Sequence, residues 1–245
     1  MRHAVRLPLE ELRPYLLELD TPQAPGRGTP SHGGSVPMDL HQLFGNDHPI
    51  EIEVGFGKGL FLVTSGSSHP DTNFLGIEIE RKYTLYVANR LAKRKLHNVR
   101  ITCGDARLLL NRLPACAVHA MHVYFPDPWW KNKHRKRRLF TSDFAQACWR
   151  VLRPGGELHL ATDVADYFAV MEQMLAEQEC WQALPPPEVS EPKHELDYLT
   201  NFERKYRSEG RAICRAVYAR TSNGEQGASP PLANAGQLRP LRATP

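Results

Sequence analysis

The sequence predicts an α/β domain built on a mostly parallel, twisted sheet with helices on both faces. Short apolar runs alternate with segments of helical spacing over residues 50–220, and this order produces parallel sheets through right-handed crossovers. A glycine-rich turn follows the first run, as expected where a strand passes directly into a helix. The chain has 245 residues, 41% of them hydrophobic, so it can bury a core without disulfide or metal staples.

Each predicted element has its own pattern. The strands are short apolar runs bounded by turn formers, at Ile50–Val54, Asn73–Ile79, Val99–Cys103, Val118–Phe125, Glu157–Ala161 and Ile213–Ala219. The helices repeat apolar residues every three or four positions, at Leu60–Ser67, Glu80–Leu96, Ala106–Leu113, Leu139–Leu152 and Ala165–Glu179. The fourth helix is predicted to end at Arg153-Pro154-Gly155-Gly156, because proline and glycine do not continue a helix.

The two ends of the chain are expected to lie outside this domain. Residues 1–49 are rich in proline and glycine and predict a loosely ordered N-terminal arm. Residues 221–245 contain four prolines and few apolar anchors, which predicts a disordered tail. We expect a cytoplasmic protein without a signal peptide, a membrane span or a metal site. Its five cysteines form no CxxC pair and are expected to stay reduced.

The net charge of +4 is unevenly distributed. Residues 81–100 hold seven lysines and arginines without an acid, and residues 131–138 hold six, so the other 217 residues sum to −9. Blocks of this kind attract phosphates, and RNA is one partner that would suit them. A lone basic block is more often a solvated helix face, so charge by itself leaves both interpretations open.

Acidic residues stand at the ends of three successive predicted strands. Glu53 precedes the glycines at 55, 57 and 59, Glu78 ends the second strand, and Asp105 follows the third. Ligands of such sheets bind beyond the carboxyl ends of the strands. Each acid alone has an ordinary explanation, such as a helix cap for Asp105. Together they fit an adenosyl ligand that carries positive charge, and the GxGxG spacing disfavours a dinucleotide oxidoreductase.

The most specific segment follows the fourth predicted strand and reads Phe125-Pro126-Asp127-Pro128-Trp129-Trp130. Two prolines restrict the backbone around Asp127, and the tryptophans offer flat apolar surface. An acid between rigid and aromatic groups suits a flipped base, which stacks on a ring and donates to a carboxylate. The alternative is a proline-stiffened loop with core tryptophans. The second basic block begins at the next residue, Lys131.

These segments resemble the tRNA (guanine-N7-)-methyltransferases. The stretches that carry the resemblance run in order over residues 51–203: EVGFGKG, GIEIE, GDA, YFPDPWWKNKHRKRR, LRPGGELHLATD and TNFE. The resemblance implies a Rossmann-like class I methyltransferase fold with a seven-stranded sheet over residues 50–220. It also implies S-adenosylmethionine as the cofactor, tRNA as the partner, and guanine 46 of the variable loop as the substrate.

The resemblance also implies roles for individual residues. The cofactor is expected at Glu53, Gly55, Gly57, Glu78, Asp105 and Asp127. Substrate contacts are expected at Lys131, Asp163, Thr200, Asn201, Phe202 and Glu203. RNA contacts are expected at Lys133, His134, Arg135, Lys136, Arg137 and Arg138. From the residues alone, Asp163 reads as a helix cap and Thr200–Glu203 as a polar loop or a helix start.

The expected reaction is a direct in-line transfer of a methyl group to guanine N7. This nitrogen has a lone pair and no proton, so no general base is needed. Asp127 is the predicted catalytic residue, because a carboxylate stabilises the positive charge that develops on the purine. Two other hypotheses stay open: a non-catalytic RNA-binding protein on a methyltransferase scaffold, and a methyltransferase for another base. The oligomeric state is expected to be a monomer or a homodimer.

Overall fold

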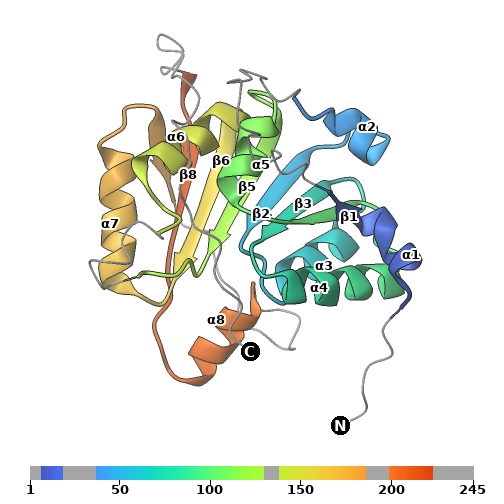
Figure 1. Ribbon diagram of the computed structural model, residues 1–245. Helices are drawn as coiled ribbons and strands as arrows, with labels where there is room; N and C mark the ends of the chain where they lie inside the picture. The colour runs from blue at the N-terminus through green and yellow to red at the C-terminus, as the bar shows by residue number, and fades with distance from the viewer. Residues whose placement is uncertain (1–6, 19–36, 130–137, 186–198, 223–245) are drawn as a thin grey trace, which may run out of the picture.

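A computed structural model describes residues 7–18, 37–129, 138–185 and 199–222 (Figure 1). These residues form one eight-stranded sheet in the order β1-β4-β3-β2-β5-β6-β8-β7. The strands are β1 (Leu16–Leu17), β2 (Ile50–Val54), β3 (Asn73–Glu78), β4 (Val99–Cys103), β5 (Val118–Tyr124), β6 (Leu152–Thr162), β7 (Trp181–Leu184) and β8 (Cys214–Arg220). Strand β8 runs antiparallel to its two neighbours, β6 and β7, and the other neighbouring pairs of this sheet are parallel.

Helices cover both faces of this sheet (Figure 1). They are α1 (Leu9–Leu12), η1 (Arg13–Tyr15), α2 (Leu40–Phe44), α3 (Leu60–Ser68), α4 (Arg81–Arg94), α5 (Ala106–Arg112), α6 (Ser142–Val151), α7 (Ala165–Ala176) and α8 (Asn201–Ser208). The apolar sides of α5, α6 and α7 share one core cluster with one sheet face, and those of α3 and α4 share a second cluster with the other. Alternation along the strands separates these two faces.

The predicted fold class is confirmed, with one difference in the number of strands. Strands β2 to β8 make up the expected seven, and β1 is an eighth that pairs with β4 at the sheet edge. A strand of two residues carries no alternation, so no sequence pattern predicts it. The strand after α6 is also longer than expected, because it begins at Leu152 and includes the Pro-Gly-Gly turn.

Parts of the expected N-terminal arm pack on the domain. Leu12 and Tyr15 are buried, and the Tyr15 ring stacks on His97 with 5.7 Å between the ring centroids. Leu40 and Phe44 of α2 belong to the larger core cluster. These segments are short and stand between proline-rich and glycine-rich stretches, so average composition hides their apolar anchors.

The division into arm, domain and tail stays a prediction. Residues 1–6, 19–36 and 223–245, which cover much of the arm and almost all of the tail, lie outside the described residues. Among the helices that the structure describes, none has the length and apolar character needed to cross a membrane.

Candidate functional site

The carboxyl ends of β2, β3 and β4 bring the predicted acids to one edge of the sheet. In the register of these parallel strands, Glu53 lies opposite Gly76 and Glu78 lies opposite Cys103. Asp105 follows β4 and begins α5. Glu53, Gly76 and Glu78 fall on the same sheet face, so the side chains of Glu53 and Glu78 lie close together. The expected juxtaposition at the strand ends is therefore present.

The turn after β2 is made by glycines at positive φ: 78° at Gly55, 49° at Gly57 and 64° at Gly59. Residues with a Cβ rarely adopt this conformation. A Cβ on Gly59 would come within 2.7 Å of Val87 on α4, whereas one on Gly55 would meet nothing within 4 Å. The turn therefore packs closely on α4 and is open beside Gly55.

Glu78 is held by the backbone around it. One carboxylate oxygen accepts from the Gly57 amide at 2.9 Å, and the other accepts from the Glu80 amide at 3.0 Å. These bonds connect the end of β3 to the glycine turn and orient the carboxylate. Each carboxylate oxygen keeps a second lone pair, so Glu78 can still accept hydrogen bonds from a ligand.

The surroundings of Glu53 favour the neutral form of its side chain. It is 2% exposed, and among the described residues its Oε2 atom has no hydrogen-bond partner. Burial, reinforced by the negative charge of Glu78, raises the pKa of Glu53 to about 8. A buried acceptor without a partner costs free energy, so a cationic or donor group placed here would stabilise the ionised carboxylate.

Asp105 caps α5 and stays ionised. Its Oδ1 accepts from the Arg107 amide at 2.9 Å, and the Arg107 side chain contacts both oxygens at 2.5–3.1 Å. Burial opposes ionisation, but the hydrogen bonds and charge of Arg107 outweigh it and lower the pKa of Asp105. Two apolar side chains next to these acids are exposed, Ile79 at 71% and Leu108 at 39%.

The loop after β5 has a strained backbone. Phe125 and Trp129 adopt φ of 53° and 42°, a region that residues other than glycine rarely occupy. Between them Pro126 is buried and Asp127 is exposed. Arg138 lies beyond the loop, where its Nε donates to the Pro128 carbonyl at 2.8 Å. The strained residues therefore flank one exposed carboxylate, Asp127.

Arg138 supports this loop, and the RNA contact that the resemblance implies for it stays a prediction. Its guanidinium also lies 5.3 Å from the centre of the Tyr167 ring. The other residues of the predicted RNA segment, and the predicted substrate residue Lys131, lie outside the described residues: Lys133, His134, Arg135, Lys136 and Arg137. Their RNA contacts stay predictions.

Helix α8 brings the TNFE segment to the same edge. Thr200 is its N-cap and accepts from the Glu203 amide at 3.0 Å, while Glu203 accepts from the Leu199 amide at 2.9 Å. This reciprocal arrangement resembles a capping box. Glu203 is 2% exposed, and its second oxygen contacts Arg215 and Arg207. The described contacts of Thr200 and Glu203 thus stabilise α8.

An aromatic cluster lies over the glycine turn and consists of Phe125, Phe202 and Tyr206. Ring centroids are 6.1 Å apart for Phe125 and Phe202 and 6.0 Å apart for Phe202 and Tyr206. A Cβ on Gly57 would lie 3.6 Å from the Phe202 ring, and Phe202 is 45% exposed. The cluster therefore exposes part of the Phe202 ring beside the glycine turn. Asn201 is half-buried next to Phe202.

Asp163 reaches this cluster from the end of β6. Its carboxylate accepts from Arg211 at 2.7 Å, and the Arg211 guanidinium lies 4.6 Å from the centre of the Tyr206 ring. Burial raises the pKa of Tyr206, and the charges of Asp163 and Asp127 add to this effect. The negative charges of Asp163 and Asp127 therefore both favour the protonated hydroxyl of Tyr206. Sequence reasoning missed Tyr206 and Arg211, although Phe202 and Tyr206 are spaced as neighbours on a helix face.

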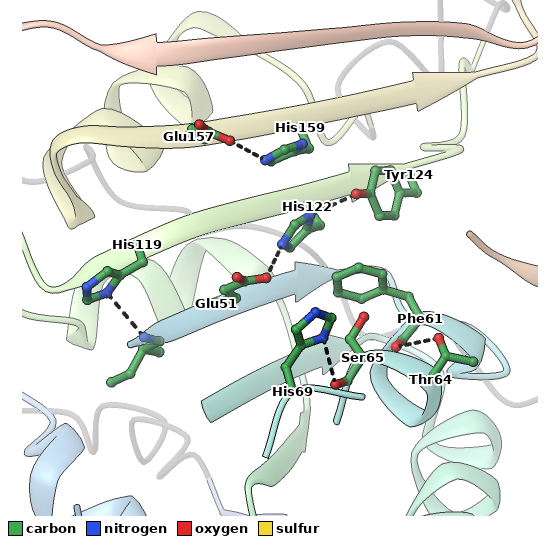
Figure 2. Close-up of polar contacts among 11 residues, drawn as sticks. Glu51, Phe61, Thr64, Ser65, His69, His119, His122, Tyr124, Glu157 and His159 are labelled. Carbon is green, nitrogen blue, oxygen red and sulfur yellow. Dashed lines mark hydrogen bonds and ion pairs between the residues drawn. The ribbon is translucent and has the colours of Figure 1, made fainter. Parts of the chain in front are cut away.

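A second polar cluster lies across β2, β5 and β6, on the same sheet face as Glu53 (Figure 2). His122 Nε2 donates to Glu51 at 2.8 Å, and the Tyr124 hydroxyl lies 2.8 Å from His122 Nδ1. The His122 ring stacks on His159 with 4.9 Å between centroids, and His159 contacts Glu157 at 2.9 Å. Within the part of the chain that the structure describes, no group of three or more metal-ligating side chains is arranged to hold a metal ion.

The known proteins described next, which are similar to this chain in sequence, are methyltransferases. A family model described as "Putative methyltransferase" matches residues 47–216. A tRNA (guanine-N(7)-)-methyltransferase of Rhodopirellula baltica is 44% identical over 192 residues, which cover 76% of this chain and 71% of that protein. A protein of the same name from Hydrogenovibrio crunogenus is 34% identical over 184 residues, which cover 75% of this chain and 77% of that protein.

Solved structures share the fold at low sequence identity. The 16S rRNA methyltransferase KamB superposes with a TM-score of 0.56 at 17% identity, covering 74% of this chain and 92% of that one. The aminoglycoside resistance methyltransferase NpmB1 gives a TM-score of 0.52 at 19% identity, covering 77% and 97%. These two structures support the methyltransferase architecture only.

Proposed function

The chain belongs to the tRNA (guanine-N(7)-)-methyltransferase family, and from this premise we propose which residues carry the reaction. The protein is an enzyme that methylates N7 of a guanine in tRNA. We propose that S-adenosylmethionine is the methyl donor and that the target is guanine 46 of the variable loop. The observation that carries the proposal is the exposed Phe202 ring between the glycine turn and Phe125, two residues before Asp127.

The residues at the strand ends fit this donor. Glu53 is a buried carboxylate, one oxygen of which has no partner among the described residues, and this suits the positive charge of the donor. Glu78 is oriented by two backbone amides and can accept from ribose hydroxyls. Ile79 and Leu108 are exposed apolar side chains beside Glu78 and Asp105, and they suit the two faces of a purine.

Bound S-adenosylmethionine supplies a methyl group on a positively charged sulfur, and guanine N7 can attack it without losing a proton. The protein therefore has to align the base and exclude water, which together contribute at most about 7–11 kcal/mol. We assign alignment to Phe202, on whose exposed face the base stacks. We assign to Asp127 the stabilisation of the charge that develops on the purine.

Asp163 assists at the base edge. The guanine edge that carries N1 and N2 donates hydrogen bonds, and a carboxylate is an acceptor for them. Arg211 holds the Asp163 carboxylate and packs on Tyr206, so it acts as a positioning residue. Thr200 and Glu203 contribute by fixing the start of α8, and thereby the place of Phe202.

The function is tested with two tRNA transcripts that differ only at position 46. With labelled donor, we expect label in the transcript with guanine there and none in the transcript with adenine. Mapping the product should give 7-methylguanosine at that position. Label on another base would contradict the target. Binding of tRNA without binding of the methyl donor in equilibrium dialysis would identify a non-catalytic RNA-binding protein.

A further inference from the structure

Helix α4 carries a row of basic and aromatic side chains, which we call the α4 stripe: Lys82, Tyr86, Arg90 and Arg94. These residues are four positions apart and therefore share one side of the helix. Lys82, Tyr86 and Arg94 are exposed and Arg90 is half-buried, whereas the opposite side of α4 is buried in the core. From Lys82 to Arg94 the stripe is about 18 Å long.

The stripe lacks the acids that usually balance a solvated helix. Residues 81–94 contain five lysines and arginines and no acid, so no oppositely charged pair forms at four-residue spacing. Arg90 and Arg94 instead place like charges on neighbouring turns. Burial lowers the pKa of Arg90, Tyr86 opposes this, and the charge of Arg94 lowers it further.

The amino end of α4 is also positively charged. The helix dipole favours acids in the first turn, but this turn has none and begins with Arg81 and Lys82. Glu80, just before the helix, lies 3.6 Å from Lys82 and balances one charge. The rest of the stripe accumulates positive charge that an anionic partner would compensate.

The stripe is attached to the proposed active site. Arg90 donates to the Lys58 carbonyl in the glycine turn, and Val87 packs against Gly59 in the same turn. Phe202 contacts this turn at Gly57. Helix α4 therefore begins beside the proposed donor site and extends away from it (Figure 1).

We propose that the α4 stripe binds the phosphate backbone of the tRNA body, as a second RNA contact apart from residues 131–138. The inference rests on the proposed function, because it takes tRNA as the substrate. A nucleic-acid strand places several phosphates along about 18 Å, so the length of the stripe matches a backbone path. The exposed Tyr86 ring, 5.9 Å from the Arg90 guanidinium, adds a flat contact surface among the charges.

The test compares two exposed arginines. Arg94→Ala removes a charge from the stripe, and Arg153→Ala removes one near His119, at the amino end of β6. Binding of unmodified tRNA is measured by filter retention across a salt series. Losing one phosphate contact lowers the slope of log K against log salt by about 0.9, so the ratio of variant to wild-type Kd shrinks about 3.5-fold between 50 and 200 mM salt.

We expect the slope of log K against log salt to fall by about 0.9 in Arg94→Ala and by about twice as much in Lys82→Ala/Arg94→Ala. Arg153→Ala should keep the wild-type slope, and Arg94→Lys should restore it because the charge is kept. The kcat at saturating tRNA should stay the same. Alanine favours helix, so a loss of folding is not expected, and thermal melts check it.

A wild-type slope for Arg94→Ala would overturn the inference, as would an equal loss of slope in Arg153→Ala. If Arg94→Ala keeps the wild-type slope, the α4 stripe contacts another partner or only solvent. Neither result bears on the proposed function, because wild-type methylation and donor binding are measured separately. Conversely, a wild-type protein that binds tRNA without methylating it would contradict the proposed reaction and leave the slope comparison valid.

Discussion

Neighbouring acids in the site have different charge states, and the cause is their immediate surroundings. Glu53 is buried beside another carboxylate, and its pKa is raised to about 8. Asp105 is also partly buried, but Arg107 bonds both of its oxygens and lowers its pKa. A protonated Glu53 can release its proton when a cation binds, whereas Asp105 is already ionised. Donor binding should therefore be coupled to proton release at Glu53.

Glu53→Gln tests this coupling. In the wild type, affinity for S-adenosylmethionine should rise with pH up to about 8, because ionised Glu53 binds the cationic donor. The variant should bind about 10–100-fold more weakly, the loss of one charge-assisted hydrogen bond, without this pH dependence. Titration calorimetry in buffers of different ionisation enthalpy measures the released proton. Glu51→Gln, on the same strand, is the control that should keep donor affinity.

The same substitution should stabilise the protein without its donor. The folded state holds a proton on Glu53 between pH 4.5 and about 8, where an unfolded chain does not, so wild-type stability falls as pH rises through this window. Glu53→Gln removes this loss, on the order of a few kcal/mol by pH 8. Thermal melts at pH 5 and pH 8 measure it. A melting temperature that changes equally in the wild type and in Glu53→Gln between these pH values would contradict the raised pKa.

Asp127→Ala tests the catalytic assignment. The side chain is exposed, so its removal should not disturb folding. We expect tRNA binding close to the wild type and a kcat lower by about 10²–10³-fold, the usual loss for one transition-state contact. Single-turnover rates with bound tRNA separate binding from chemistry. Turnover at the wild-type rate would show that another group stabilises the charge on the purine.

At the scale of elements, the capping bonds at the start of α8 determine the position of Phe202 in the site. Its eight residues would not form a stable helix alone. Thr200 and Glu203 cap its start, and Arg215 on β8 contacts Glu203. These bonds fix the first turn of α8, which carries Phe202. Residues that look like substrate contacts in sequence thus also determine where the aromatic cluster stands.

A matched pair of caps tests this role. Thr200→Ala and Thr141→Ala each remove a threonine N-cap, from α8 and α6, and each should cost about 0.5–2 kcal/mol of stability. Only Thr200→Ala should lower kcat/KM for tRNA methylation, because only α8 carries Phe202. Thr200→Ser keeps the capping oxygen and should restore activity. If Thr141→Ala lost activity equally, global stability would explain both.

At the scale of the whole molecule, charge is separated. The donor edge gathers carboxylates, whereas α4 and residues 131–138 are basic. The cluster of Figure 2 lies beside Glu53, because His122 pairs with Glu53 in the strand register; β2, β5 and β6 contribute its members Glu51, His122 and His159. Burial lowers the pKa of His159 to about 4, and the neighbouring His122 adds to this effect. This neutral imidazole makes global stability sensitive to acid.

Acid destabilises the protein because the unfolded state binds a proton at His159 more readily than the folded state does. An unfolded histidine binds a proton below about pH 6.5, but folded His159 resists it until about pH 4, so acid favours unfolding in between. We expect a loss of about 1–2 kcal/mol at pH 5 that His159→Gln removes. His41→Gln, at an exposed position, should behave like the wild type. Denaturant melts at pH 7 and pH 5 measure the difference.

Local patterns were sufficient for most of the fold. Apolar runs bounded by glycine and proline located β2, β4 and β5, and the breakers after Leu152 located the end of α6. Patterns failed for β1 and β7, which have two and four residues and no clear alternation. For α8 they left a polar loop and a helix start both open, because its start is polar and its stability comes from contacts with distant residues.

By itself, the sequence determined the order of strands and helices, the glycine turn and the acids at the strand ends. These features depend on backbone conformation and on side-chain periods within a few residues. Only the tertiary structure decided that Phe202 lies over Gly57, that Arg211 holds Asp163, and that Arg138 supports a loop. Such contacts join residues distant in sequence, and they depend on how the elements pack, which no local pattern contains.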